Sequence, residues 1–387
     1  MPQILVFLMT TGAVNYIYGY FAVGVGILFF YQAIKSRRLW LNGVTQRDFW
    51  WLFAFAISYA AIGYGGSVQS ILYYVAVPVV SYLAGWIIVE ANWENKEKTI
   101  HSIIVAAMFG CCVHAALNYV SNIGKERWML TDFFTGELRA ATGSGSINTI
   151  AFSLAFHFVQ IEKSLKMKIA GLSCFAVSFL YAMLLGTRTQ FIILIITMFF
   201  ILLIYMSEHR GTKENAKMLR RVFLLAVIIC LAYSMNLMGI QEYYQKSNLN
   251  ARFVHTEDTA RTDEYRFVSV FDGMTSLFEN PLGGLHSKGY FHNMWLDVGR
   301  IGGIIPTLFI VAFTMESIRA ARCFFLSDAQ QTARYMIAAL MCGFMLNFFV
   351  EPILEGLFDS FYLFCIIHGM LKSYLYYADK ESRLYPG

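Results

Sequence analysis

Apolar runs of roughly 17 to 25 residues recur along the whole chain, and polar stretches separate them. This is the length that an α-helix needs to cross about 30 Å of hydrocarbon. Segments of alternating apolar and polar residues, which a barrel would need, are not apparent, so helical spans are predicted throughout. We predict about eleven transmembrane helices, and a separate short element at 1–13 would make twelve. The spans are residues 14–34, 49–63, 68–89, 100–122, 146–161, 168–186, 190–206, 221–240, 301–317, 335–350 and 357–375.

The composition supports an integral membrane protein. The 387 residues are 57% hydrophobic and only 14% charged, whereas a soluble domain usually has about 25% charged residues. The spans recur from one end of the chain to the other, so residues 1–387 are predicted to form a single all-α polytopic transmembrane domain. Six of the seven cysteines fall within predicted spans as small apolar residues, which indicates neither a disulfide framework nor a metal site.

The basic residues predict an orientation. When the spans alternate across the membrane, 20 of the 30 Lys and Arg residues fall on one side, mostly in short loops. Short loops rich in Lys and Arg stay in the cytoplasm, so residues 241–300 are predicted to face outward. The basic residues are thus explained as orientation signals, and a nucleic-acid partner is not expected.

Residues 241–300 form one long polar segment between apolar spans, and we predict that this extracytoplasmic loop carries the site. In a helix, the five residues from Arg261 to Arg266 correspond to about 500° of rotation, which is more than a full turn. The two side chains therefore do not share one narrow face. One arginine then binds ligand while the other pairs with Asp263 or Asp272. The alternative is a solvated helix of mixed charge.

Arg188 lies in a turn of about four residues between two spans on the outer side. Its guanidinium group either binds a lipid phosphate at the membrane surface or reaches from the bilayer to water without a ligand.

His292 precedes the point at which the chain enters the membrane again. Histidine is a general base at neutral pH in many enzymes, although a histidine at a helix start is more often structural. Asn293 and Asp297 either orient this histidine or cap the helix. Three acidic residues cluster in the turn before the last span, and we expect them either to bind sugar hydroxyls or to pair with the arginines. They are Glu351, Glu355 and Asp359.

Taken in order, these motifs resemble the O-antigen polymerase and ligase family. The residues that carry the resemblance are Gly186-Thr187-Arg188, Arg261 with Glu264-Tyr265, the turn Asn280-Pro281-Leu282-Gly283-Gly284, and His292-Asn293 followed by Gly302-Gly303. The resemblance implies a GT-C-like glycosyltransferase at the periplasmic face of a bacterial inner membrane, without a metal or other cofactor.

The same resemblance implies roles for individual residues. Arg188 and Arg261 would bind the diphosphate of an undecaprenyl-diphosphate-linked oligosaccharide, with Arg266 as a third cation, and His292 would be the catalytic base. Apart from this carry-over, the candidates for orienting or sugar-binding roles are Asn293, Glu264, Tyr265, Asp297, Glu351 and Glu355. The expected partners are the lipid-linked oligosaccharide, membrane lipid and a chain-length regulator protein.

The predicted function is therefore a polymerase of O-antigen or a related surface polysaccharide. It would transfer the growing glycan onto a sugar hydroxyl of a lipid-linked repeat unit, with inversion at the anomeric carbon. One alternative is an O-antigen ligase that transfers glycan to the lipid A core. The other is a flippase or transporter of lipid-linked sugars, which would need charges along a central path, and predicted charges within the spans are scarce.

Overall fold

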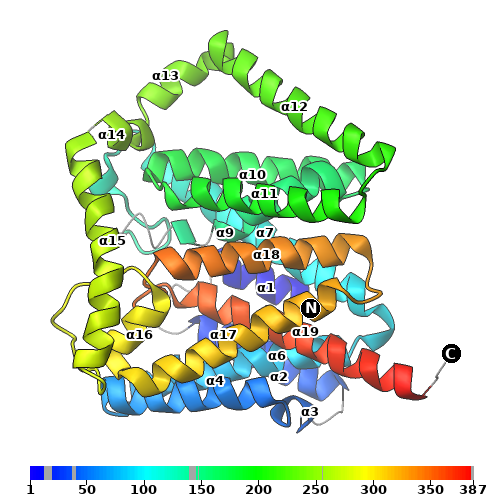
Figure 1. Ribbon diagram of the computed structural model, residues 1–387, viewed down its shortest axis with the longest axis vertical. Coiled ribbons are helices and arrows are strands. Elements are labelled where there is room, and N and C mark those ends of the chain that lie inside the picture. The colour runs from blue at the N-terminus through cyan, green and yellow to red at the C-terminus, as the bar shows by residue number, and fades with distance from the viewer. Residues whose placement is uncertain (13–19, 37–40, 139–144, 147, 255, 385–387) are drawn as a thin grey trace.

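The structure, a computed structural model, describes residues 1–12, 20–36, 41–138, 145–146, 148–254 and 256–384. Within these ranges, the side chains of residues 20–22, 36, 41, 238, 256–267 and 384 lie outside the description. Every regular element in the described residues is a helix (Figure 1).

Helices lie over the described part of each of the eleven predicted spans, and residues 14–19 and 147 of those spans lie outside the described residues. They are α2 (Tyr20–Ser36), α4 (Arg47–Ser58) with η1 (Tyr59–Gly63), η2 (Ile71–Ala76) with α6 (Val77–Glu90), α7 (Lys96–Asn122), α9 (Thr149–Phe156) with η5 (His157–Ile161), α10 (Leu165–Leu185), α11 (Thr189–Glu208), α12 (Lys213–Ser234), α17 (Ile304–Phe325), α18 (Gln331–Val350) and α19 (Phe358–Leu384). Among the described helices, six are long and apolar enough to cross a membrane, and these confirm an all-α membrane protein. For the five other ranges, membrane crossing stays a prediction.

The long polar segment is largely helical. It contains α13 (Ile240–Gln245), α14 (Asn248–Val254), α15 (Thr256–Glu279) and α16 (Met294–Gly302). In Figure 1, α12 and α13 form an arch above α10 and α11, and α14 and α15 run down the left-hand edge towards α16. We call this left-hand end the site end. It holds residues 64–67, 186–189, 280–303 and 351–357.

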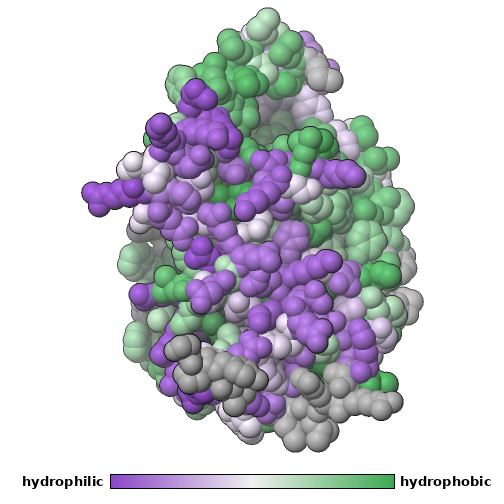
Figure 2. Space-filling model, turned by 90° about the vertical axis from the view of Figure 1, so that its right-hand side faces the viewer, coloured by the Kyte–Doolittle hydropathy of each residue, from purple (hydrophilic) through white to green (hydrophobic). Residues whose placement is uncertain are grey.

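The opposite end of the bundle is strongly polar. Seen from that end, hydrophilic side chains form a continuous band between hydrophobic flanks (Figure 2). The turns between α11 and α12 and between α17 and α18 lie there, as does the end of α19 (Figure 1). Towards this end, the buried Asp48 carboxylate ties α4 to α19, because it lies 2.7 Å from His368 Nε2 and 3.3 Å from Lys372 Nζ.

The core contains a close crossing of α6 and α19 that depends on two glycines. A Cβ atom on Gly85 would lie 2.0 Å from the carbonyl oxygen of Ile366, and one on Gly369 would lie 2.0 Å from that of Tyr82. The two backbones therefore approach more closely than any larger residue permits.

We expect Gly85→Ala to destabilise the protein by about 1–3 kcal/mol, because the added methyl group forces the two backbones apart. Gly26→Ala in α2 is the matched control, since a Cβ atom there meets nothing within 4 Å. Thermal unfolding of both purified variants measures the difference. Equal unfolding temperatures would show that the crossing tolerates the methyl group.

Candidate functional site

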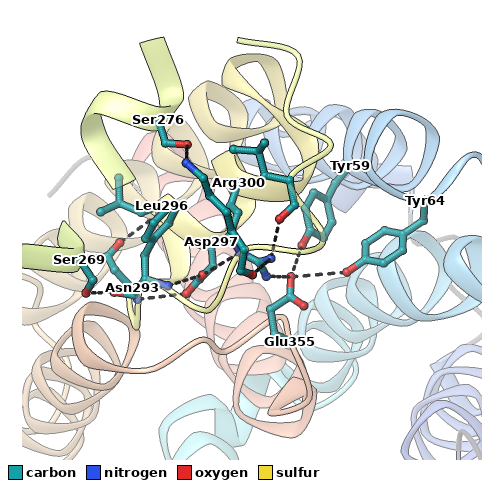
Figure 3. A network of polar contacts seen from close by, with 12 residues as sticks. Tyr59, Tyr64, Ser269, Ser276, Asn293, Leu296, Asp297, Arg300 and Glu355 are labelled. Carbon is teal, nitrogen blue, oxygen red and sulfur yellow. Dashed lines mark hydrogen bonds and ion pairs between the residues drawn. The ribbon is translucent and has the colours of Figure 1, made fainter. Parts of the chain in front are cut away.

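A buried polar network surrounds Arg300 in α16 (Figure 3). Arg300 is only 3% exposed, and its Nε lies 3.3 Å from Asp297 Oδ1. Its NH2 group lies 3.4 Å from Glu355 Oε1, while NH1 donates to the backbone oxygens of Leu285 (3.1 Å) and Lys288 (2.9 Å). One guanidinium group therefore joins α16, the loop before it and the turn between α18 and α19.

The second carboxyl of the network, Glu355, is held by two tyrosines from the first half of the chain. The hydroxyl groups of Tyr59 and Tyr64 donate to Glu355 Oε1 over 3.2 Å and 3.5 Å. Burial raises the pKa of Glu355, Arg300 opposes this shift, and the charge of Asp297 adds to it. Because one cation faces two buried carboxyl groups, the network favours retention of a proton on Glu355.

Asp297 fixes the backbone on both sides of His292. Its Oδ1 accepts from the N–H of Phe291 at 2.8 Å, and its Oδ2 accepts from the N–H of Asn293 at 3.2 Å. Burial raises the pKa of Asp297, although these two hydrogen bonds and Arg300 oppose the shift. The carboxyl group thus acts on the turn that carries the predicted base.

His292 itself adopts an uncommon backbone conformation. Its φ angle is 53°, which is sparsely populated by residues other than glycine and is found more often at functional sites. The ring is half-buried, and its centroid lies 6.4 Å from that of Tyr290. The hydrogen bonds of Asp297 on either side compensate for this conformation and hold the imidazole at the site end.

Asn293 caps α16 and connects it to α18. Its side-chain oxygen accepts from the N–H of Leu296 at 3.2 Å, and its Nδ2 donates to the carbonyl oxygen of Phe349 at 3.3 Å. On the other side, Ser269 Oγ in α15 donates to the carbonyl oxygen of Phe291. The turn containing His292 is therefore held between α15 and the end of α18.

Two of the sequence motifs meet backbone to backbone. The turn at 280–284 packs against residues 301–303, where the N–H of Gly284 donates to Ile301 and the N–H of Ile304 donates to Pro281. Gly283 and Gly303 both have positive φ, and a Cβ atom on Gly303 would lie 2.2 Å from the Pro281 oxygen. These glycines are thus needed for close approach at the end of α16.

Arg188 is the N-cap residue of α11, and its side chain is half-buried. Gly186, two residues before Arg188, is the C-cap of α10 and has a φ angle of 65°. Two arginines bind the last carbonyl oxygens there, since Arg127 Nε donates to Leu185 and Arg252 NH1 donates to Gly186. Three arginines from three separate segments therefore lie around this turn.

The end of α18 brings the Arg188 turn and the His292 turn together. Thr189, next to Arg188, donates through Oγ1 to Glu351 Oε1 at 3.0 Å. Asn293, next to His292, donates to Phe349. Phe349 and Glu351 are only two residues apart, so their Cα atoms are separated by at most about 7 Å.

The side chains of Arg261, Glu264, Tyr265 and Arg266 lie outside the described part of the structure. Their backbone belongs to α15, which starts beside α14 and is joined to the His292 turn at Ser269 (Figure 1). Ser269 is three residues after Arg266 and eight after Arg261, which correspond to rises of about 4.5 Å and 12 Å along the helix.

Sequence reasoning singled out Arg188, His292, Asn293, Asp297, Glu351 and Glu355, and the structure puts these at the site end. It missed the central role of Arg300 and the tyrosines Tyr59 and Tyr64. The spacing of Asp297 and Arg300, three residues apart on a helix, was an available signal for the ion pair. No comparable signal exists for the tyrosines, since Tyr59 is 296 residues from Glu355.

The site end gathers arginine, carboxyl and imidazole side chains, which are the groups that bind anions, accept hydrogen bonds and take up protons. Among the described residues, no group of three or more His, Cys, Asp or Glu side chains is gathered closely enough to hold a metal ion. No protein-family model matches this chain, and a search of curated proteins found no similar sequence.

Proposed function

We propose that this protein is a membrane glycosyltransferase that polymerises a surface polysaccharide of the O-antigen type. The observation that supports this most is the convergence of the Arg188 turn and the His292 turn on residues Phe349–Glu351. The residues next to Arg188 and His292 thus bind the same helix end. An arginine is suited to binding phosphate and a histidine to proton transfer, which supports the proposal.

The proposed reaction is a single displacement at the anomeric carbon of the donor sugar. The bond from this carbon to the diphosphate oxygen breaks as a bond to the acceptor hydroxyl oxygen forms, and the hydroxyl proton passes to His292. Polyprenyl diphosphate leaves with the electron pair, and Arg188 and Arg261 stabilise its negative charge. The configuration at the carbon is inverted, so a polymer linkage with retained configuration would contradict this mechanism.

The residues around the base would act as positioning groups. Asp297 fixes the turn containing His292, and Arg300 fixes Asp297. The GT-C-like architecture, the bacterial inner membrane and the periplasmic orientation of the site end belong to the same proposal, and the distribution of basic residues supports the orientation.

The experiment that tests the proposal is surface-glycan analysis in a deletion strain that carries the wild-type gene or a variant. The wild type should restore a ladder of polymer lengths, whereas the deletion should leave core with one repeat unit. Bare core, with glycan retained on its carrier lipid, would instead identify a ligase. A normal ladder in the deletion strain would contradict both activities.

In the same strain, we expect Arg188→Ala and Arg261→Ala each to shorten the ladder strongly. A charge-assisted hydrogen bond contributes about 1.5–3 kcal/mol, so its loss should lower the transfer rate about tenfold to a hundredfold. Arg383→Ala, an exposed arginine near the end of α19, is the control and should leave the ladder unchanged. Full ladders from both site variants, at normal protein levels, would remove the arginines from the mechanism.

A further inference from the structure

A large apolar groove runs along three helices of the bundle. Its volume is about 920 Å³, within the range of pockets that bind small molecules. Side chains from α11, α17 and α18 line it, including Phe200, Ile204, Val311, Met315, Met341 and Met345.

The groove extends along the helices rather than across them. Its lining residues on α17 and the turn that follows run from Val311 to Leu326, which corresponds to about 22 Å of helix rise. Hydrocarbon in a bilayer is about 30 Å thick, so the groove follows most of that thickness. Its shape suits one extended hydrocarbon chain.

The chemistry of the lining also suits hydrocarbon. The hydroxyl group of Thr314 donates to the carbonyl oxygen of Ile310 at 2.7 Å and accepts from Trp295 Nε1 at 3.2 Å. This polar group in the wall is therefore already satisfied within the protein. The methionine side chains are flexible and adapt to irregular apolar shapes such as a methyl-branched chain.

One end of the groove reaches the candidate site. Trp295 and Phe349 line that end, and Trp295 lies three residues after His292. The carbonyl oxygen of Phe349 accepts the hydrogen bond of Asn293. A chain that enters here begins beside the turn that carries the proposed base, and its other end points towards Arg322.

We infer that this groove binds the polyisoprenoid chain of the donor, the substrate whose diphosphate is the leaving group. This inference rests on the proposed function. The diphosphate of the donor is attached to the reacting carbon, so its lipid chain must start within a few bonds of the catalytic centre. The reacting hydroxyl of the acceptor lies on a sugar at a distance from its own lipid, so the acceptor lipid has no need of a groove that opens beside His292.

Kinetics of the purified full-length protein with two donors test the assignment. One donor carries the full polyisoprenoid chain and the other a chain of two isoprene units. Cys342→Phe fills the middle of the groove and should raise KM for the long-chain donor roughly tenfold, the effect of losing a few buried methylene contacts, with little change for the short one. Cys230→Phe, at an exposed cysteine on α12, is the matched control and should change neither value.

If Cys342→Phe changes KM equally for both donors, or changes it for neither, the groove assignment is overturned. Failure of the wild type to transfer glycan from either donor would instead contradict the proposed function. A second readout does not depend on turnover: a photoactivatable polyisoprenyl diphosphate should label peptides of α17 and α18 in the wild type and not in Cys342→Phe. If phosphatidylglycerol abolishes this labelling and unlabelled polyisoprenyl diphosphate does not, the groove binds phospholipid and the assignment is wrong.

Discussion

Replacing His292 with alanine should abolish the polymer ladder and leave single repeat units on the surface. A sugar hydroxyl ionises too weakly at neutral pH to attack without a base, and a positioned general base typically gives about 10²- to 10⁴-fold in rate. The variant should therefore lose this factor in kcat while the protein remains in the membrane. The ladder in a complemented deletion strain, with the membrane protein level checked, measures the effect.

Two further variants separate the role of the His292 imidazole from the role of its backbone conformation. His286→Ala removes an exposed histidine from the same segment and should leave the ladder intact. His292→Asn keeps a side chain that tolerates positive φ, so the turn should fold although the base is absent. A full ladder from His292→Asn would mean that the residue serves the conformation of the turn rather than proton transfer.

The helices could be predicted from the sequence because each apolar run carries its own signal. A run such as Thr189–Glu208 is long and apolar without reference to the rest of the chain. The helical form of the polar segment was less evident, because α15 carries charged and polar residues that are equally common in loops. Its helix is stabilised in part by contacts with the turn at His292, as at Ser269.

Residues of the site could be predicted individually, but their arrangement could not. Arg188 and His292 lie more than one hundred positions apart, and only the end of α18 brings their turns together. The glycine motifs were predictable as turns, whereas their contact across the end of α16 depends on the path of the whole loop. Three-dimensional contacts of this kind leave no local pattern in one sequence.

The Arg300 network explains why a residue outside the reaction should still be essential. Arg300 is buried against two carboxyl groups and two carbonyl oxygens. Arg300→Met keeps much of the bulk of the side chain but leaves these partners without their cation. Such a loss typically lowers the free energy of unfolding by about 3–5 kcal/mol. We expect a large fall in the thermal stability of the purified protein.

The expected loss of activity follows from the same contacts. Without Arg300, the loop through Leu285 and Lys288 loses its anchor, and Asp297 loses the cation that favours its charged form. The turn at His292 then lacks its support. Arg300→Lys should recover little of the stability or activity. A guanidinium group donates to four acceptors at once, whereas a single ammonium group cannot reach all of them.

Glu355→Gln is the variant that tests this account of the network. Burial raises the pKa of Glu355, so folding favours the protonated acid, which glutamine imitates in shape and charge. The wild type should lose stability as pH rises from the ordinary pKa of a glutamate to the raised pKa of Glu355 in the folded protein. Over this range, the folded state must give up a proton that it holds more tightly than the unfolded state does. The variant lacks this titration, so its unfolding temperature relative to the wild type should increase with pH. If Glu355→Gln instead destabilises the protein as much as Arg300→Met at every pH, an ionised Glu355 would be required, and the interpretation that folding favours a protonated Glu355 would be wrong.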